Sequence, residues 1–378
     1  MSTLGSMKSR PTASLSMEAG SWDESEQDEE SHRSIKGVVS YGADYTVDGL
    51  VKRVRQKTFD IPPFQRKQVW SRTQKSRFIE SLLLDLPVPG IFVASLPVPG
   101  VSLNNRSKYF VIDGQQRLLA LQTFCDITME KRERFRLCGV EKRWKNKYFE
   151  DLTIDDQQRL DDAIIHTTII KQEKSKSTPT NNDAILEIFH RLNTGGNFLS
   201  PQEIRVALAF DLAMSKLLEE ANEDSTWRGI YGNPNKRMKD RELILRFWAL
   251  YLQHESYKEP MRVFLNDFYK DASEFEEEKR RNLVKIFSNA IEIIYNGVGE
   301  KVFRPDKVIN AAVFDSVMVG IAKRLALGEI FNIGEIKSAY EDLLNNKKYQ
   351  DAYMSRTSRT EKVHTRIRAA IEAFKDIS

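Results

Sequence analysis

Residues 111–118 read Val-Ile-Asp-Gly-Gln-Gln-Arg-Leu, and this stretch decides the fold of the first half of the chain. An apolar run ends at Asp113, and apolar residues at helical spacing follow at Leu118, Leu121 and Phe124. Gly114 lies between the two patterns and permits a sharp turn. The stretch therefore predicts a strand, a tight turn and an amphipathic helix.

The turn gathers polar side chains that suit phosphate chemistry. The carboxylate of Asp113 could hold a divalent ion, and Gly114 lets a ligand approach the backbone closely. The amides of Gln115 and Gln116 could orient a water molecule, while Arg117 could place its guanidinium on phosphate oxygens at the helix N-terminus. An ordinary structural turn is the alternative interpretation of the same residues.

Short β patterns alternate with helical patterns in the first half of the chain. The predicted strands are 91–95, 109–112, 135–137 and 164–171, and the predicted helices are 47–54, 72–86 and 115–124. From about Asn181 the pattern is helical, with a capping box at Ser200-Pro201-Gln202-Glu203 and later helices at 241–252, 276–296, 310–326, 333–344 and 360–374. The predicted fold class is α+β, a small α/β lobe followed by an all-helical lobe.

The first residues differ in composition from the rest of the 378-residue chain. Seven acidic residues and no basic residue occur between Glu18 and Glu30, in a segment rich in Ser and Gly. Such a segment buries too little apolar surface to offset its ordering entropy. We therefore expect an acidic disordered tail over 1–40, an α/β domain over 41–178 and a helical domain over 179–378.

The cysteines, histidines and apolar runs of the chain limit the classes of protein to which it can belong. The two cysteines, Cys125 and Cys138, are too few for a disulfide framework, and the five histidines form no metal-binding pair. No apolar run is long enough to cross a membrane, and the first residues lack the apolar core of a signal peptide. We expect a cytoplasmic protein without a membrane partner.

Two basic stretches are candidate nucleic-acid surfaces. Residues 131–147 contain eight Lys or Arg against two Glu, with Phe135 and Trp144 among them and Tyr148 next in the chain. A solvated hairpin with one apolar face explains this stretch equally well. The second is the terminal helical pattern with Arg356, Arg359, Lys362, His364, Arg366 and Arg368, for which a solvated face is the ordinary interpretation.

Two further polar clusters flank the Asp-Gly turn in sequence. The first lies in Ile61-Pro62-Pro63-Phe64-Gln65-Arg66, where the prolines stiffen a loop that presents Gln65 and Arg66. The second ends a predicted helix at Arg191-Leu192-Asn193-Thr194-Gly195-Gly196, where Arg191 and Asn193 could contact a phosphate or a ribose.

Taken in order, these motifs resemble the N-terminal domain of the GmrSD type, which occurs in modification-dependent restriction and phage-defence proteins. The resemblance rests on the motif with Gln65, Arg66 and Trp70, on Asp113-Gly114-Gln115-Gln116-Arg117, and on the segment from Phe189 to Arg205. It spans roughly residues 46–204, and more weakly the helical pattern after it. The chain departs from many relatives because it shows no histidine-metal nuclease motif.

The resemblance implies a fold like that of ParB and sulfiredoxin, with Mg2+-dependent hydrolysis of a nucleoside triphosphate (NTP). The implied catalytic residues are Asp113, Gln115, Gln116 and Arg117, with Asp113 also the metal ligand. The implied cofactor-binding residues are Gln65, Arg66, Gly114, Arg191 and Asn193. DNA is the expected partner, a nuclease would be a separate subunit, and a homo-oligomer is compatible with these features.

Three functions follow from these observations. The first is an NTP-hydrolysing regulator in a DNA-directed restriction or antiviral defence system. The second is a DNA- or nucleotide-binding sensor or adaptor without turnover. The third is weak DNA nicking by the ParB-like lobe.

Overall fold

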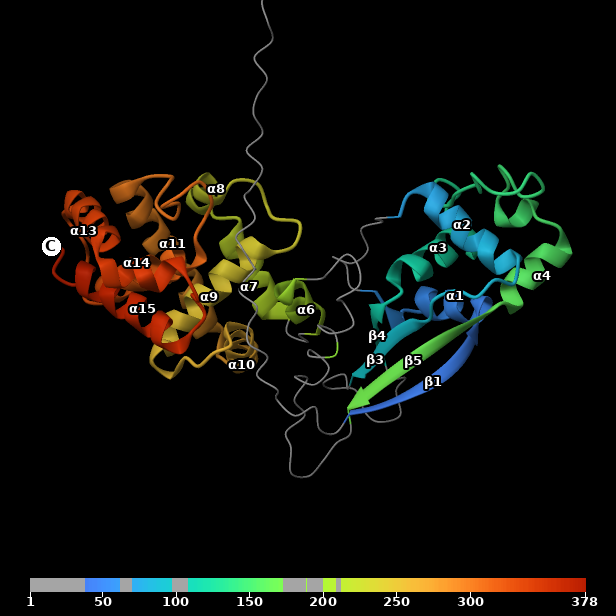
Figure 1. The fold of residues 1–378 in the computed structure, drawn as a ribbon, viewed down its shortest axis with the longest axis horizontal. Coiled ribbons are helices and arrows are strands. Elements are labelled where there is room, and N and C mark those ends of the chain that lie inside the picture. The colour runs from blue at the N-terminus through green and yellow to red at the C-terminus, as the bar shows by residue number, and fades with distance from the viewer. Residues whose placement is uncertain (1–37, 62–69, 97–107, 173–187, 189–199, 209–211) are drawn as a thin grey trace, which may run out of the picture. The chain divides into compact units, whose positions relative to one another are not determined.

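The computed structural model describes residues 38–61, 70–96, 108–172, 188, 200–208 and 212–378 (Figure 1). They fall into two compact units, one within Ser31–Ser215 and the other within Lys216–Ser378. The first unit contains a sheet with helices and the second is helical, which confirms the predicted α+β class.

The sheet of the first unit has the strand order β1-β5-β3-β4-β2. The strands are β1 (Val38–Thr46), β2 (Phe59–Asp60), β3 (Ile91–Leu96), β4 (Lys108–Asp113) and β5 (Ile164–Gln172). β1 and β5 are antiparallel along their full length, and Figure 1 shows them side by side. β3 is parallel to β5 and antiparallel to β4. Because β4 also pairs with β2 on its other side, it lies inside the sheet, and the turn follows its end.

Side-chain caps begin most helices of this unit. The helices are α1 (Val47–Arg55), α2 (Arg72–Leu83), α3 (Gln115–Cys125), α4 (Ile154–Asp162) and α6 (Pro201–Leu208). Thr46 caps α1, and Ser71 forms a capping box on α2. The predicted capping box of α6 is confirmed, because Ser200 Oγ accepts from Glu203 N–H at 3.1 Å and Glu203 Oε2 from Ser200 N–H at 2.7 Å.

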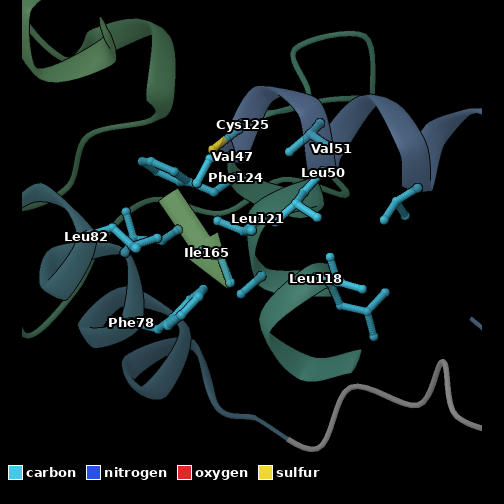
Figure 2. Packing of buried hydrophobic residues seen from close by; sticks show 14 of the residues in the cluster. Val47, Leu50, Val51, Phe78, Leu82, Leu118, Leu121, Phe124, Cys125 and Ile165 are labelled. Atoms are coloured by element: carbon cyan, nitrogen blue, oxygen red, sulfur yellow. The ribbon is translucent and has the colours of Figure 1, made fainter. Parts of the chain in front are cut away.

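The core of the first unit lies between the sheet and the helices α1, α2 and α3. Figure 2 shows Val47 and Leu50 of α1, Phe78 of α2, Leu121 of α3 and Ile165 of β5 pointing toward one another. Each of these side chains is at most 7% exposed. This packing fixes α3 against the sheet and so fixes the turn that precedes it.

The second unit is built from helices alone among its described residues. They are α7 (Leu212–Asn222), which begins just before the division, α8 (Ser225–Tyr231), α9 (Lys239–Gln253), α10 (Met261–Ser273), α11 (Glu277–Val298), α12 (Ala311–Leu325), α13 (Ile333–Asn345), α14 (Lys347–Met354) and α15 (Thr360–Phe374). The five helices predicted after residue 240 are confirmed as α9, α11, α12, α13 and α15. Two 3-10 turns, Phe149–Asp151 in the first unit and His254–Ser256 here, complete the assignments.

Three local predictions differ from the structure. Residues 135–137 form no strand, because Leu137 bonds to Asn146 and Lys147 inside a looped segment and not to the sheet. Helix α2 ends at Leu83, three residues earlier than predicted, and the chain turns through Asp85 with a positive φ of 54°. Strand β1 begins at Val38, within the range assigned from the sequence to the tail.

Within the part of the chain that the structure describes, no helix combines the length and apolar character needed to cross a membrane.

Candidate functional site

Gly114 forms the turn between β4 and α3. Its φ is 95°, in the left-handed region that favours glycine, and it is the N-cap of α3. A Cβ added here would lie 2.9 Å from Cγ1 of Ile91 and 3.3 Å from Nη2 of Arg117. Both the backbone conformation and the close packing therefore require glycine at this position.

The N-terminus of α3 has no side-chain cap and no acidic residue in its first turn. The first backbone hydrogen bond of the helix runs from Leu118 N–H to Gly114 O at 3.0 Å. The N–H groups before Leu118 have no acceptor inside the helix, and the helix dipole adds partial positive charge there. This end of α3 has the electrostatic character of an anion-binding site.

Arg117 is held in place by two neighbours. Its Nη2 donates to Asp113 Oδ2 at 2.8 Å and to the backbone oxygen of Gly90 at 2.8 Å. The side chain of Arg117 is 13% exposed, whereas that of Asp113 is 52% exposed. Arg117 Nε is buried and has no hydrogen-bond partner. The guanidinium is thus fixed beside the helix N-terminus while one of its donors is unused.

The two glutamines of the turn have different surroundings. Gln116 Oε1 accepts from the backbone N–H of Trp70 at 3.3 Å, which ties α3 to the residue before the cap of α2. Gln115 Oε1 is buried and has no donor within hydrogen-bond distance. An unsatisfied buried acceptor is costly, so a water molecule or ligand that donates to Gln115 would be stabilised.

The structure thus brings together five of the predicted site residues, Asp113, Gly114, Gln115, Gln116 and Arg117. The other four predicted residues, Gln65, Arg66, Arg191 and Asn193, lie outside the described residues.

Asp113 is the one predicted metal ligand. Among the described residues, no group of three or more His, Cys, Asp or Glu side chains is placed to hold a metal ion. Mg2+ commonly binds one or two carboxylates and completes its octahedron with phosphate oxygens and water. The half-exposed carboxylate of Asp113 at an anion-binding turn fits that mode, in which the nucleotide supplies further ligands.

Two supporting contacts were not predicted from the sequence: one involves Gly90, and the other involves the backbone of Trp70, a residue that the sequence had placed in the motif with Gln65 and Arg66. Gly90 anchors Arg117 through its carbonyl oxygen, and a Cβ at Gly90 would lie 2.8 Å from the backbone oxygen of His166. Trp70 donates to Gln116 through its backbone. A glycine directly before the predicted strand at Ile91 was a signal for close backbone packing, but a backbone donor such as that of Trp70 leaves no signal in the sequence.

Two of the six residues in the basic stretch considered from the sequence at the end of the chain have partners within the second unit. Arg366 is fully buried and its Nη2 donates to Asp315 Oδ2 at 3.1 Å. Lys362 pairs with Asp351. The fully buried Asp315 also accepts two hydrogen bonds from Arg246, at 3.1 and 2.6 Å. Arg366 of α15 therefore belongs to the core of the second unit and not to an interaction surface.

The sheet order, the helix cover and the polar turn after β4 define an α+β domain with its candidate site at a helix N-terminus. Residues 47–210, which include this turn, match the family described as GmrSD restriction endonuclease, N-terminal domain. The match covers less than half of the chain; over residues 47–210 it supports the resemblance to this family and suggests a component of a restriction or defence system. A comparison with curated proteins finds no significant match.

Proposed function

We propose that the chain binds a nucleoside triphosphate at the turn 113–117 and hydrolyses it with Mg2+, as the regulatory component of a DNA-directed restriction system that acts with a separate nuclease. The observation that carries the proposal is the uncapped N-terminus of α3 beside the fixed guanidinium of Arg117. Together, the free N–H groups of the helix and the guanidinium suit a phosphate group.

The phosphate would be bound by two kinds of donor. Backbone N–H groups at the start of α3 point along the helix axis, and Arg117 adds a full positive charge next to them. Because Asp113 and Gly90 already orient the guanidinium, little side-chain entropy is lost when the anion binds. Gly114 leaves the space that the approach of a phosphate requires.

Asp113 gives a physical reason for the proposed Mg2+ requirement. Its carboxylate lies beside the proposed phosphate position and would repel the negatively charged oxygens in the absence of a cation. Mg2+ held by Asp113 would supply charge neutralisation for the phosphate oxygens. Gln115, whose buried Oε1 lacks a donor, is the better placed of the two glutamines to accept a hydrogen bond from the attacking water.

The rate of NTP hydrolysis tests this proposal. Phosphate release is measured for each of the four NTPs, with and without Mg2+ and duplex DNA, for the wild type, Asp113→Ala and Arg117→Ala. Arg77→Ala is the matched control, because Arg77 is an exposed arginine of α2 in the same unit. We expect hydrolysis by the wild type and the control, with loss of at least about a hundredfold in both site variants.

A sensor or adaptor without turnover is the second candidate. The ion pair between Asp113 and Arg117 favours it, because each charged group already has a partner. Saturable NTP binding without phosphate release under any condition, by folded wild type, would replace the hydrolase with this sensor. Hydrolysis that survives both site substitutions would place the catalytic centre elsewhere.

A further inference from the structure

We propose that residues 131–148, which we call the basic platform, form a docking surface for the phosphate backbone of a nucleic acid. This surface is separate from the turn 113–117, so the inference goes beyond the proposed nucleotide site. Residues 131–147 carry eight Lys or Arg against two Glu, a net charge of +6, whereas the whole chain carries +4. The segment therefore has a larger net positive charge than the chain as a whole.

The platform is held rigidly without a regular helix or strand. Trp144 is fully buried and its Nε1 donates to Asp156 Oδ2 at 2.9 Å. Leu137 is also fully buried; its N–H donates to Lys147 O at 3.0 Å, and its carbonyl accepts from Asn146 N–H at 2.8 Å. These contacts fix the backbone, so the cations are presented from a preorganised support.

Helix α2 provides further anchors for the platform. Arg72 Nε donates to the backbone oxygen of Arg136 at 2.7 Å, and Ser76 Oγ accepts from Cys138 N–H at 3.0 Å. Glu80 Oε1 accepts from Glu141 N–H at 2.7 Å. All three contacts use backbone groups of the platform and leave the side chains of its cations available.

Ion pairs involve only some of the cations of the platform. Three arginines are neutralised by glutamates at 2.6 to 3.0 Å, in the pairs Arg132–Glu130, Arg134–Glu150 and Arg143–Glu141. Within the described residues, five other basic side chains have no carboxylate partner, namely Lys131, Arg136, Lys142, Lys145 and Lys147. All but the half-buried Lys147 are exposed.

The ring of Tyr148 gathers three of the cations. Lys131 Nζ, Arg134 Cζ and Arg136 Cζ lie 5.0, 5.7 and 4.8 Å from its centroid. The ring attracts each cation, but the cations repel one another, and Glu150 pairs with Arg134 alone. A polyanion that bound there would relieve this repulsion and release its own counterions.

The chemistry of the platform favours a nucleic acid over a lipid surface. A membrane-binding segment presents apolar side chains for insertion beside its basic residues. In the platform, Leu137 and Trp144 are fully buried and contribute to the core of the unit. Exposed cations spread along a rigid loop are what a row of phosphates requires.

Fluorescence anisotropy with labelled 30-base-pair DNA tests the inference on the full chain without nucleotide. One variant combines Lys142→Gln, Lys145→Gln and Lys147→Gln; a second carries Arg136→Gln, whose backbone oxygen still accepts from Arg72. The control combines Lys285→Gln, Lys337→Gln and Lys347→Gln, exposed residues of the second unit with the same total charge change as the triple platform variant. Thermal unfolding confirms that all variants are folded.

We expect the triple platform variant to bind at least about tenfold more weakly and to lose about 2 to 3 from the slope of log affinity against log salt. The single variant should show a smaller loss and the control little change. Equal losses in platform and control variants, or none, would overturn the inference, as would polyglutamate binding that depends on the platform when DNA binding does not. The same titration with duplex RNA shows whether the platform binds DNA or RNA more tightly.

Asp113→Ala should bind DNA as the wild type does. A loss of nucleotide binding in this variant would therefore be observed separately from a loss of DNA binding.

Discussion

Arg117 Nη2 lies 2.8 Å from Asp113 Oδ2, so the arginine proposed to bind phosphate is paired with the carboxylate proposed to bind Mg2+. The two residues are four apart and flank the glycine turn, which makes the pair a property of the turn geometry. In the absence of nucleotide, Asp113 orients Arg117. When phosphate and Mg2+ bind, Asp113 must either release Arg117 or contact Arg117 and the cation together.

The first prediction concerns the Mg2+ dependence of nucleotide binding. Asp113→Asn removes the negative charge and keeps the side-chain size, so repulsion of the phosphate disappears. Without Mg2+, the variant should bind a fluorescent NTP analogue roughly fivefold more tightly than the wild type. Added Mg2+ should tighten binding by the wild type and have little effect on the variant. A variant with the full Mg2+ response of the wild type would exclude Asp113 as the metal ligand.

The second prediction concerns Gly114. Gly114→Ala forces a Cβ against Ile91 and Arg117 and strains a residue with φ of 95°. We expect a loss of stability of about 1–3 kcal/mol and a loss of nucleotide binding. Gly232→Ala is the control, because Gly232 also has φ of 95° but has no atom within 4 Å of the added Cβ. The control should lose stability alone, as measured by thermal unfolding and NTP titration.

The third prediction concerns the buried charges of the second unit. Asp315→Asn leaves Arg246 and Arg366 without the carboxylate that both contact, so unfolding in urea should show a loss of about 3–5 kcal/mol. Glu277→Gln removes one partner of the exposed pair with Arg281, and because solvent screens this pair its effect should be far smaller than that of Asp315→Asn. A tolerated Asp315→Asn would mean that the two arginines are compensated by other groups.

The fourth prediction concerns pH. Burial, with the nearby charges of Asp48 and Asp162, raises the pKa of Asp161 to about 6. The folded state therefore holds this proton more tightly than the unfolded state, and the associated stability, present below about pH 4, is lost as the pH rises through 6.

Asp161→Asn should accordingly raise stability at pH 8 by roughly 1 kcal/mol, a value reduced for partial solvent exposure, and have little effect at pH 4. Asp155→Asn is the control, because Asp155 lies in the first turn of the same helix, where a negative charge is favourable. Thermal unfolding at several pH values measures both variants. Equal stabilisation at pH 4 and pH 8 would contradict the role assigned to burial.

Local patterns were sufficient to predict the turn and most elements around it. The strand ending at Asp113, the glycine and the apolar spacing of α3 are signals within a dozen residues, and the structure agrees with them. The capping box at Ser200 is equally local. Such elements are predictable because the interactions that form them are close in sequence.

Contacts between distant residues explain what the sequence did not predict. Arg366 was considered a surface residue because its partner Asp315 is 51 positions away, and the stretch 135–137 was predicted as a strand although its partners lie in a loop. The anchoring of Arg117 by the Gly90 carbonyl spans 27 positions and involves a backbone atom. Such contacts can be identified in the folded structure but not from local patterns in the sequence.

The proposed role of Arg117 in phosphate binding is best examined by equilibrium binding of an NTP analogue to Arg117→Ala, Arg77→Ala and the wild type. We expect binding at least about tenfold weaker for Arg117→Ala and unchanged affinity for Arg77→Ala, with all three proteins folded. Wild-type affinity in folded Arg117→Ala would contradict a nucleotide site at residues 113–117, because the phosphate would then be bound somewhere other than the N-terminus of α3.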